Sequence, residues 1–292
     1  MANLKEVRNR ITSVNSTMQI TSAMKMVSAA KLKKAQDAVT QMRPFSEKLS
    51  EVLSNLTASL DSSESVYGPH GEVNNILLIP VTSNRGLCGG FNSQIVKATQ
   101  GLIKTKYAGK SVKVLSIGKK VADIMSKEGY AITDGSLPEN ANHIFDNLTY
   151  SNVEKVAQQV MDSYISGEFD EIVLIYNTFK NAATQIVVKE QFLPVVAPEN
   201  ADSTATVDYI FEPNKEDILE VIVPKSLKTQ IFKAVLDSFA GEQGARMTAM
   251  HKATDNAGDL LKELKLTYNK ARQTAITTEI LEIVSGAEAM NA

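Results

Sequence analysis

The sequence predicts an α/β domain inserted between the two halves of a long antiparallel coiled coil. Apolar residues near both ends of the 292-residue chain recur in steps of three and four, which is the period of a left-handed coiled coil. Between these ends, short apolar runs alternate with helical stretches, a pattern typical of a small, mainly parallel sheet covered by helices. We therefore expect a coiled-coil helix over residues 1–60, an α/β domain over 70–208 and a second coiled-coil helix over 209–292.

The first helix is predicted by its lack of breakers as well as by its period. Residues 1–60 contain no glycine and a single proline, Pro44. Because proline removes a backbone donor and costs roughly 3 kcal/mol inside a helix, we expect Pro44 to bend or interrupt this one. Between residues 19 and 31 small and polar side chains replace the apolar ones, and the stripe is expected to shift there. The apolar positions are Leu4, Val7, Ile11, Val14, Met18, Leu32, Ala35, Val39, Met42, Leu49, Leu53, Leu56 and Leu60.

The same step returns in the last 80 residues of the chain. No proline occurs from Lys225 to Ala287, so one long helix is expected there. After Ala275 the stripe slips by one residue to Ile276, Ile280 and Ile283. Two such stripes of similar length can bury one another as an antiparallel pair. The C-terminal stripe consists of Met247, Met250, Thr254, Ala257, Leu261, Leu264, Tyr268, Ala271 and Ala275.

The middle of the chain predicts alternating strands and helices. The last strand alternates in polarity like an edge strand, whereas residues 76–81 form a short apolar run and residues 171–176 are expected to be a buried strand. Residues 61–75 and 194–207 are the expected linkers to the helical ends. The expected elements are strands over 76–81, 112–117, 171–176 and 185–192, and helices over 92–107, 119–128 and 152–166.

Composition excludes several classes of function. The formal charge of −2 provides no global polycation for nucleic acid, and no run of 18 apolar residues predicts a membrane span. No secretory signal is expected. The single cysteine, Cys88, cannot form an internal disulfide. His70, His143 and His251 are more than 70 residues apart, so no metal site and no cofactor are expected. Residues 1–60 carry a net +5, either a solvated helix face or a surface for an acidic partner.

A glycine-rich turn is the most tempting nucleotide signal. Gly86, Gly89 and Gly90 follow an expected strand and precede an expected helix, but their spacing differs from the dinucleotide fingerprint. Gly109–Ser111 imitates the end of a Walker A loop, yet it precedes a strand instead of following one. We interpret the glycines as allowing a tight turn. Cys88 within the turn is either a reactive thiol or, as we favour, a small packed residue.

No catalytic constellation emerges from the residues. Neither a nucleophile elbow nor a zinc-protease helix motif is present. Polar residues do interrupt the apolar C-terminal helix, and taken alone they indicate ordinary exposed surface. They are Arg246, Lys252, Lys270, Arg272, Gln273 and Thr277.

Four ordered segments resemble signatures of the gamma subunit of F-type ATP synthase, the central rotor shaft. They are Met24–Lys31, Ser83–Gly90, Ala245–Met250 and Tyr268–Thr277. The resemblance covers the chain from end to end and is closest to the bacterial type. It implies a terminal antiparallel coiled coil with an inserted Rossmann-like domain. It also implies a non-catalytic role: a rotating shaft would couple proton or sodium flux to ATP synthesis or hydrolysis in the subunits around it.

The resemblance assigns contacts position by position. It implies that Met24 and Lys25 meet an acidic loop of a catalytic subunit, and that Arg246, Gln273 and Thr277 grip the catalytic subunits. Ile276, Ile280 and Ile283 would turn in an apolar bearing. Tyr209, Phe211 and Glu212 would form the foot that meets the membrane c-ring and the epsilon subunit.

The partners implied are thus the alpha and beta subunits, epsilon and the c-ring, with no nucleic acid. The chain would lie at the cytoplasmic face of the bacterial plasma membrane, held there only through the complex. Two other functions stay open from the residues alone. One is an enzyme whose site lies in the central α/β domain, and the other is a static coiled-coil scaffold.

Overall fold

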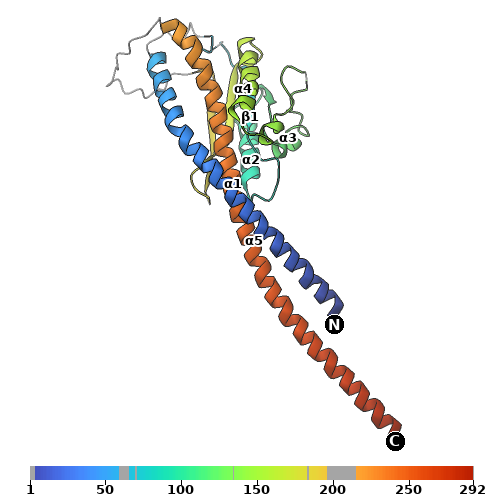
Figure 1. Cartoon of the computed structure of the whole chain (residues 1–292). Coiled ribbons are helices and arrows are strands. Elements are labelled where there is room, and N and C mark those ends of the chain that lie inside the picture. Colours follow the sequence, from blue (N-terminus) through green and yellow to red (C-terminus); the bar gives the residue numbers. More distant parts are fainter. Residues whose placement is uncertain are drawn as a thin grey trace. The chain divides into compact units, whose positions relative to one another are not determined.

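The computed structural model describes residues 4–58, 66–69, 71–133, 135–182, 184–195 and 215–291. Two long helices dominate the secondary structure: α1 (Leu4–Ala58) and α5 (Lys215–Asn291) (Figure 1). The chain divides into two compact units, Met1–Ser28 with Met247–Ala292, and Ala29–Arg246. Each long helix therefore contributes to both units.

The larger unit contains a four-stranded sheet in the order β2-β1-β3-β4. β1 (Asn75–Pro80) is parallel to both β2 (Ser111–Val114) and β3 (Glu171–Phe179), whereas β4 (Gln185–Leu193) is antiparallel to β3. The prediction of a mainly parallel sheet with an edge strand at 185–192 is therefore confirmed. The strand order, with β1 between β2 and β3, was not predictable from the sequence.

Helices cover both faces of this sheet because successive strand side chains point to opposite faces. In β1, Ile76 and Leu78 pack with residues of α2 (Phe91–Lys104) and α3 (Lys119–Met125). Leu77 and Ile79 pack with residues of α4 (Tyr150–Ile165) and with α5. A short 3-10 helix, Asn142–Phe145, precedes α4. Every side chain of β1 after Asn75 is consequently buried, which explains its continuous apolar run.

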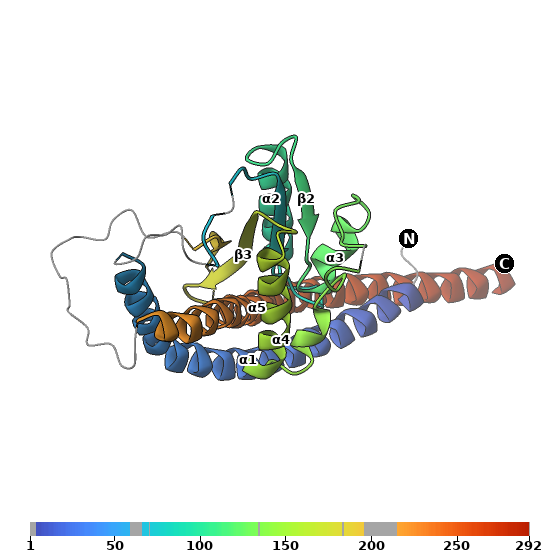
Figure 2. The same ribbon diagram turned by 90° about the horizontal axis from the view of Figure 1, so that it is seen from above.

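Within the larger unit, α1 and α5 run side by side (Figure 2). Ala35 and Val39 of α1 pack against Leu236 and Ala240 of α5, each 6% exposed or less. The predicted stripe is thus the buried one. Of the two outcomes expected at Pro44, the interruption is wrong, because α1 continues through it to Ala58, while the bend stays a prediction. One missing backbone hydrogen bond is outweighed by the packing of the turns before it.

The smaller unit also pairs α1 with α5. Buried or half-buried positions on α5 follow the predicted step, with Met250, Ala257, Leu261 and Leu264 all below 10% exposure. The expected shift of the α1 stripe between 19 and 31 is wrong. Thr21 and Ser28 are 8% and 2% exposed, so polar side chains occupy the same stripe in unbroken register. The pattern of apolar and polar residues was misleading here because small side chains fit between two helices, and the Thr21 hydroxyl is hydrogen-bonded to the Met18 carbonyl and to Thr254.

Candidate subunit interface

The C-terminal tip of α5 carries apolar side chains that are exposed to solvent. From Ile276 to Met290 every residue of the helix is exposed. Ile276, Ile280 and Ile283 are 44%, 54% and 71% exposed, and their i, i+4, i+7 spacing places them on one side. A row of apolar side chains left in water is the usual mark of a surface that another protein covers.

The smaller unit itself explains why this tip lacks a partner. Arg8, near the start of α1, donates from Nη2 to the Tyr268 hydroxyl at 2.7 Å, and its guanidinium lies 5.7 Å from the ring centre. The two helices are antiparallel, and α1 starts at Leu4, about one turn before Arg8. The first turn of α1 therefore covers α5 only about one turn beyond Tyr268. Among the described residues, nothing of α1 faces the tip.

Gln273 and Thr277 lie on this unpaired part of α5, as the resemblance implied. Both side chains are exposed, and the Thr277 hydroxyl donates to the backbone carbonyl of Gln273 at 2.9 Å. The Gln273 amide therefore projects from a regular helix with its donors and acceptor available to an outside group. Their predicted grip on the catalytic subunits stays a prediction.

Met24 and Lys25 are half-buried in the smaller unit. The Lys25 Nζ lies 3.4 Å from Nδ1 of His251, which in turn lies 3.3 Å from a carboxylate oxygen of Asp255. Lys25 thus occupies the α1–α5 seam rather than standing free of it. The contact with an acidic loop, predicted for this pair, stays a prediction.

Sequence reasoning missed three exposed apolar residues beside that pair. Ile20, Met26 and Val27 are 60%, 65% and 56% exposed. They lie off the three-four stripe, and that offset is the signal that would have found them. An apolar side chain outside the buried stripe of a paired helix must face away from its partner helix.

Arg246 has its partners inside the larger unit. It is 7% exposed, and Nη1 pairs with a carboxylate oxygen of Glu242 at 2.5 Å. Nη2 donates to the backbone carbonyls of Arg85 and Gly86, at 3.0 and 3.2 Å. Burial raises the pKa of Glu242 above its usual value, and the Arg246 charge opposes that rise. The grip on catalytic subunits predicted for Arg246 stays a prediction, and the structure adds an internal role.

Polar groups of the glycine-rich turn form hydrogen bonds within the turn and with the start of α2. The Ser83 amide donates to Oδ1 of Asn92 at 3.0 Å, and Nδ2 of Asn92 lies 3.1 Å from the Cys88 sulfur. Cys88 is 2% exposed, in keeping with a packed residue. A phosphate loop directs backbone N–H groups at its ligand, whereas this turn directs two carbonyls at a guanidinium. Its geometry therefore opposes phosphate binding.

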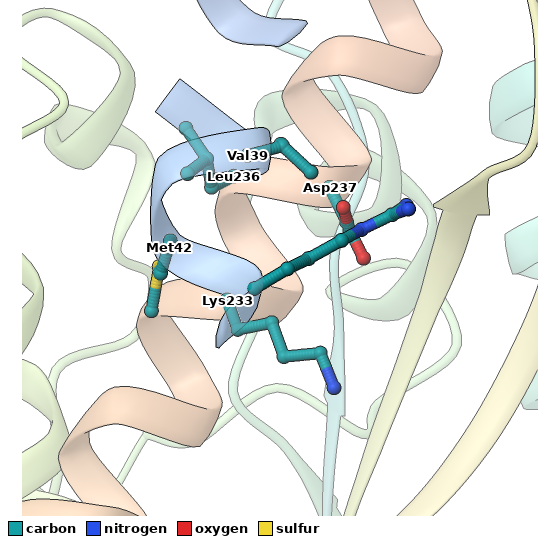
Figure 3. A pocket seen from close by; sticks show the side chains of 6 residues that line it. Val39, Met42, Lys233, Leu236 and Asp237 are labelled. Atoms are coloured by element: carbon teal, nitrogen blue, oxygen red, sulfur yellow. The ribbon is translucent and has the colours of Figure 1, made fainter. Parts of the chain in front are cut away.

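A small, partly open pocket of about 10 Å³ lies between α1 and α5 in the larger unit. Figure 3 shows Val39 and Met42 from α1 and Lys233, Leu236 and Asp237 from α5 around it. Small-molecule sites usually measure roughly 300–1,000 Å³, so the pocket is too small for a nucleotide. Asp237 is 3% exposed, and burial raises the pKa of its carboxyl while nearby Arg43 and Lys233 lower it.

Comparison with known proteins decides the family. The ATP synthase family model matches residues 3–290. The ATP synthase gamma chain of Flavobacterium johnsoniae is 59% identical over 292 residues, covering all of both chains. The chain belongs to the ATP synthase gamma chain family. A more distant member, the gamma chain of Rhodospirillum rubrum, is 43% identical over 302 residues and covers 99% of this chain and all of its own.

Solved structures agree with this gamma-chain membership. The Tetrahymena thermophila mitochondrial ATP synthase central stalk and c-ring structure contains a chain 27% identical to this one. The match has a TM-score of 0.57 and covers 80% of this chain and 99% of that one. A chain in the Euglena gracilis mitochondrial OSCP, F1 and c-ring structure shares the fold, with a TM-score of 0.69 at 23% identity and 98% and 94% coverage.

Some expectations for a gamma chain lie outside the described residues. These include the proposed foot, Tyr209, Phe211 and Glu212, as well as His70. Within the described ranges, no cluster of three or more His, Cys, Asp or Glu side chains is placed to hold a metal ion. The helices in the same ranges include none with a long enough apolar stretch to cross a membrane.

Proposed function

We propose that this chain is the central shaft of a rotary ATP synthase and makes or breaks no covalent bond itself. The observation that carries the proposal is the exposed row Ile276, Ile280 and Ile283 on an unpaired helix. A helix that needed these side chains for its own stability would bury them. They are available instead for an apolar bearing formed by other subunits.

The shaft would act through unequal contacts with chemically identical catalytic subunits. An asymmetric helix pair in the axis of an alpha–beta ring favours a different conformation in each catalytic subunit, because it makes different contacts with each. Turning the shaft exchanges those conformations and so couples ion-driven rotation to ATP synthesis or hydrolysis. Gln273 and Thr277 would grip the catalytic subunits, while Met24 and Lys25 would meet an acidic loop.

The other end of the shaft would meet the membrane rotor. Tyr209, Phe211 and Glu212 would contact the c-ring and the epsilon subunit. The chain would then be a peripheral protein of the cytoplasmic face of the bacterial plasma membrane, held there only through the complex. Absence of a suitable spanning helix in the described ranges is compatible with that placement.

The decisive experiment compares ATP hydrolysis by purified alpha–beta ring subunits with and without this chain. We expect no hydrolysis by the chain alone and altered hydrolysis by the ring when the chain is present. The triple variant Ile276→Ser, Ile280→Ser, Ile283→Ser should lose most of that effect. Its melting temperature should be unchanged, because the three side chains are already in water. Hydrolysis by the chain alone would overturn the proposal in favour of an enzyme.

A matched control changes polar residues on the same unpaired segment. Glu279→Gln with Glu282→Gln keeps the apolar row and should behave as wild type within a factor of two. A cross-link from the tip to a catalytic subunit separates a rotor from a static scaffold. With Ile283→Cys in a Cys88→Ser background, cross-linking should stop turnover of the assembled complex. Undiminished turnover of the cross-linked complex would favour the scaffold.

A further inference from the structure

The glycine-rich turn contains an exposed apolar residue, Leu87, whose backbone conformation is unfavourable. Leu87 has φ of 63°, in the left-handed region that bulky side chains avoid, and it is 63% exposed. Because the Leu87 side chain is exposed, its own burial and packing do not offset the free-energy cost of that backbone conformation. Such strain persists only where surrounding contacts impose it, and it concentrates at functional positions.

Those surrounding contacts come chiefly from one guanidinium. Arg246 bonds to the carbonyls of Arg85 and Gly86, the two residues immediately before Leu87. The guanidinium is fixed in turn by the buried carboxylate of Glu242, one helical turn earlier on α5. Charge-assisted bonds from a buried group are the strong and directional kind.

The opposite side of the turn is fixed by a second set of bonds. The Ser83 hydroxyl lies 2.6 Å from the Arg85 carbonyl oxygen, and Asn92 bonds to both the Ser83 hydroxyl and the Cys88 sulfur. Arg85 and Leu87, by contrast, are exposed. Residues on the inner side of the turn are thus tied down, and those on the outer side are offered to solvent.

Two glycines in α5 allow this helix to approach the α/β domain closely, so that the Arg246 guanidinium reaches the turn. A Cβ on Gly241 would lie 3.2 Å from the Gln185 side chain, and one on Gly244 would lie 3.1 Å from Ala182. Glycine inside a helix costs about 1 kcal/mol relative to alanine. That cost is repaid only by close approach, here of the 241–246 segment to the α/β domain.

From these contacts we infer that Arg246 is a positioning residue for the surface turn. Together with Glu242 it clamps the carbonyls of Arg85 and Gly86, and thereby presents Leu87 on the outer side of the turn. The presented side chain contacts a neighbouring subunit of the complex, a clause that rests on the proposed function. In this view Arg246 acts through the turn rather than by touching another subunit.

The rate at which Cys88 is labelled measures how firmly the turn is held in the isolated full-length chain. Cys88 is buried inside the turn, so a thiol reagent such as a maleimide reacts only when the turn opens. The double variant Arg246→Met with Glu242→Met removes both charges and leaves neither unpaired, which buried ion pairs tolerate well. We expect its labelling rate to rise at least tenfold at a temperature well below the melting transition.

Arg43→Met is the matched control. It removes another guanidinium that donates to a carbonyl, that of Phe179 at 3.4 Å, away from the turn. Its Cys88 labelling rate should stay within twofold of wild type. Arg246→Lys, which keeps the charge but not the fork of donors, should fall between wild type and the double variant. Equal labelling rates in all four chains would overturn the clamp.

A double-mutant cycle in the assembled complex tests how Arg246 acts. Leu87→Gly removes the presented side chain at a position where glycine is at ease. We expect the clamp variant and Leu87→Gly each to reduce the chain's effect on ring hydrolysis, and the combination to lose no more than the larger single loss. Losses that multiply would overturn the inference in favour of a direct grip by Arg246. No loss with Leu87→Gly would overturn the presentation of Leu87.

These outcomes are separable from failure of the proposed function. If the wild-type chain leaves ring hydrolysis unchanged, the shaft proposal fails. The labelling rates still decide whether Arg246 clamps the turn, because they are measured without any partner.

Discussion

Two isoleucines on α5 differ greatly in burial although they belong to the same helix. Ile231 is 1% exposed in the core cluster beneath the sheet, whereas Ile283 is 71% exposed near the end of the helix. Their side chains and their backbone conformation are alike, so intrinsic preference cannot separate them. The available partner does, because Ile231 faces the sheet and α4, while Ile283 faces nothing among the described residues. Burial is a property of the packing around a side chain, and an exposed apolar row marks where the chain's own packing ends.

Truncating each isoleucine gives the largest expected contrast. Ile231→Ala should lower the free energy of unfolding by about 2–5 kcal/mol, because it leaves a cavity in a packed core. Ile283→Ala should change it by less than about 0.5 kcal/mol. Urea unfolding of both variants measures the contrast. Similar losses at the two positions would mean that the tip is packed within the chain after all.

The arginines of the same helix extend the comparison to charge. Arg246→Met alone should destabilise the chain by about 3 kcal/mol, since it leaves the Glu242 carboxylate buried without a partner. Arg272→Met, on an exposed position, should cost less than about 0.5 kcal/mol. Thermal unfolding checks both values. Adding Glu242→Met to Arg246→Met should restore most of the lost stability, and a further loss would contradict the argument.

Asp237 gives the buried region a pH dependence that the tip lacks. Burial raises the folded-state pKa of this carboxyl, so the folded chain holds the proton more tightly than the unfolded chain. Its charge therefore costs stability above the raised pKa, and the cost disappears as the pH falls toward the unfolded value. Asp237→Asn should raise stability by about 1 kcal/mol at pH 7.5, with little gain at pH 4. Melting temperatures of both chains across this range provide the measurement, and a gain that grows on acidification would refute it.

The smallest expected effect concerns the polar positions of the α1–α5 seam. The hydroxyl oxygens of Thr21 and Thr254 lie 2.9 Å apart in a partly buried place, and each also lies within hydrogen-bond distance of a backbone carbonyl of its own helix, that of Met18 or Met250. Replacing both with valine should change stability by less than about 1 kcal/mol, because neither hydroxyl is left unpaired. Thr254→Val alone should cost no more than the double change, because the Thr21 hydroxyl still donates to the Met18 carbonyl. The free energies of unfolding of the wild-type chain and of these two variants test this order.

Much of the architecture follows from periodicity. The three-four step on α5 marks the positions that are buried, among them Ala257, Leu261 and Leu264. The continuous apolar runs at 76–81 and 171–176 mark the strands that helices cover on both faces. These predictions succeed because periods of 3.6 and 2 residues are set by the backbone itself, and long elements repeat them many times.

Polar residues were predicted less well, and for a definite reason. Thr21 and Ser28 continue the buried stripe although a polarity pattern reads them as its end. Arg246 looks like exposed helix surface in the sequence, yet it is buried against the turn at Arg85 and Gly86. The partners of such groups lie 160 residues away or on the other helix. No local pattern carries that information.

By itself the sequence determined the two long helices, their buried stripe, the strands of the inserted domain and the apolar row at 276–283. Tertiary structure alone decided the strand order, the burial of Arg246 with Glu242 and the outward presentation of Leu87. The division has a physical basis. Periodicity and propensity act between residues a few positions apart, whereas a buried charge or a strained turn exists only when distant segments meet and satisfy it.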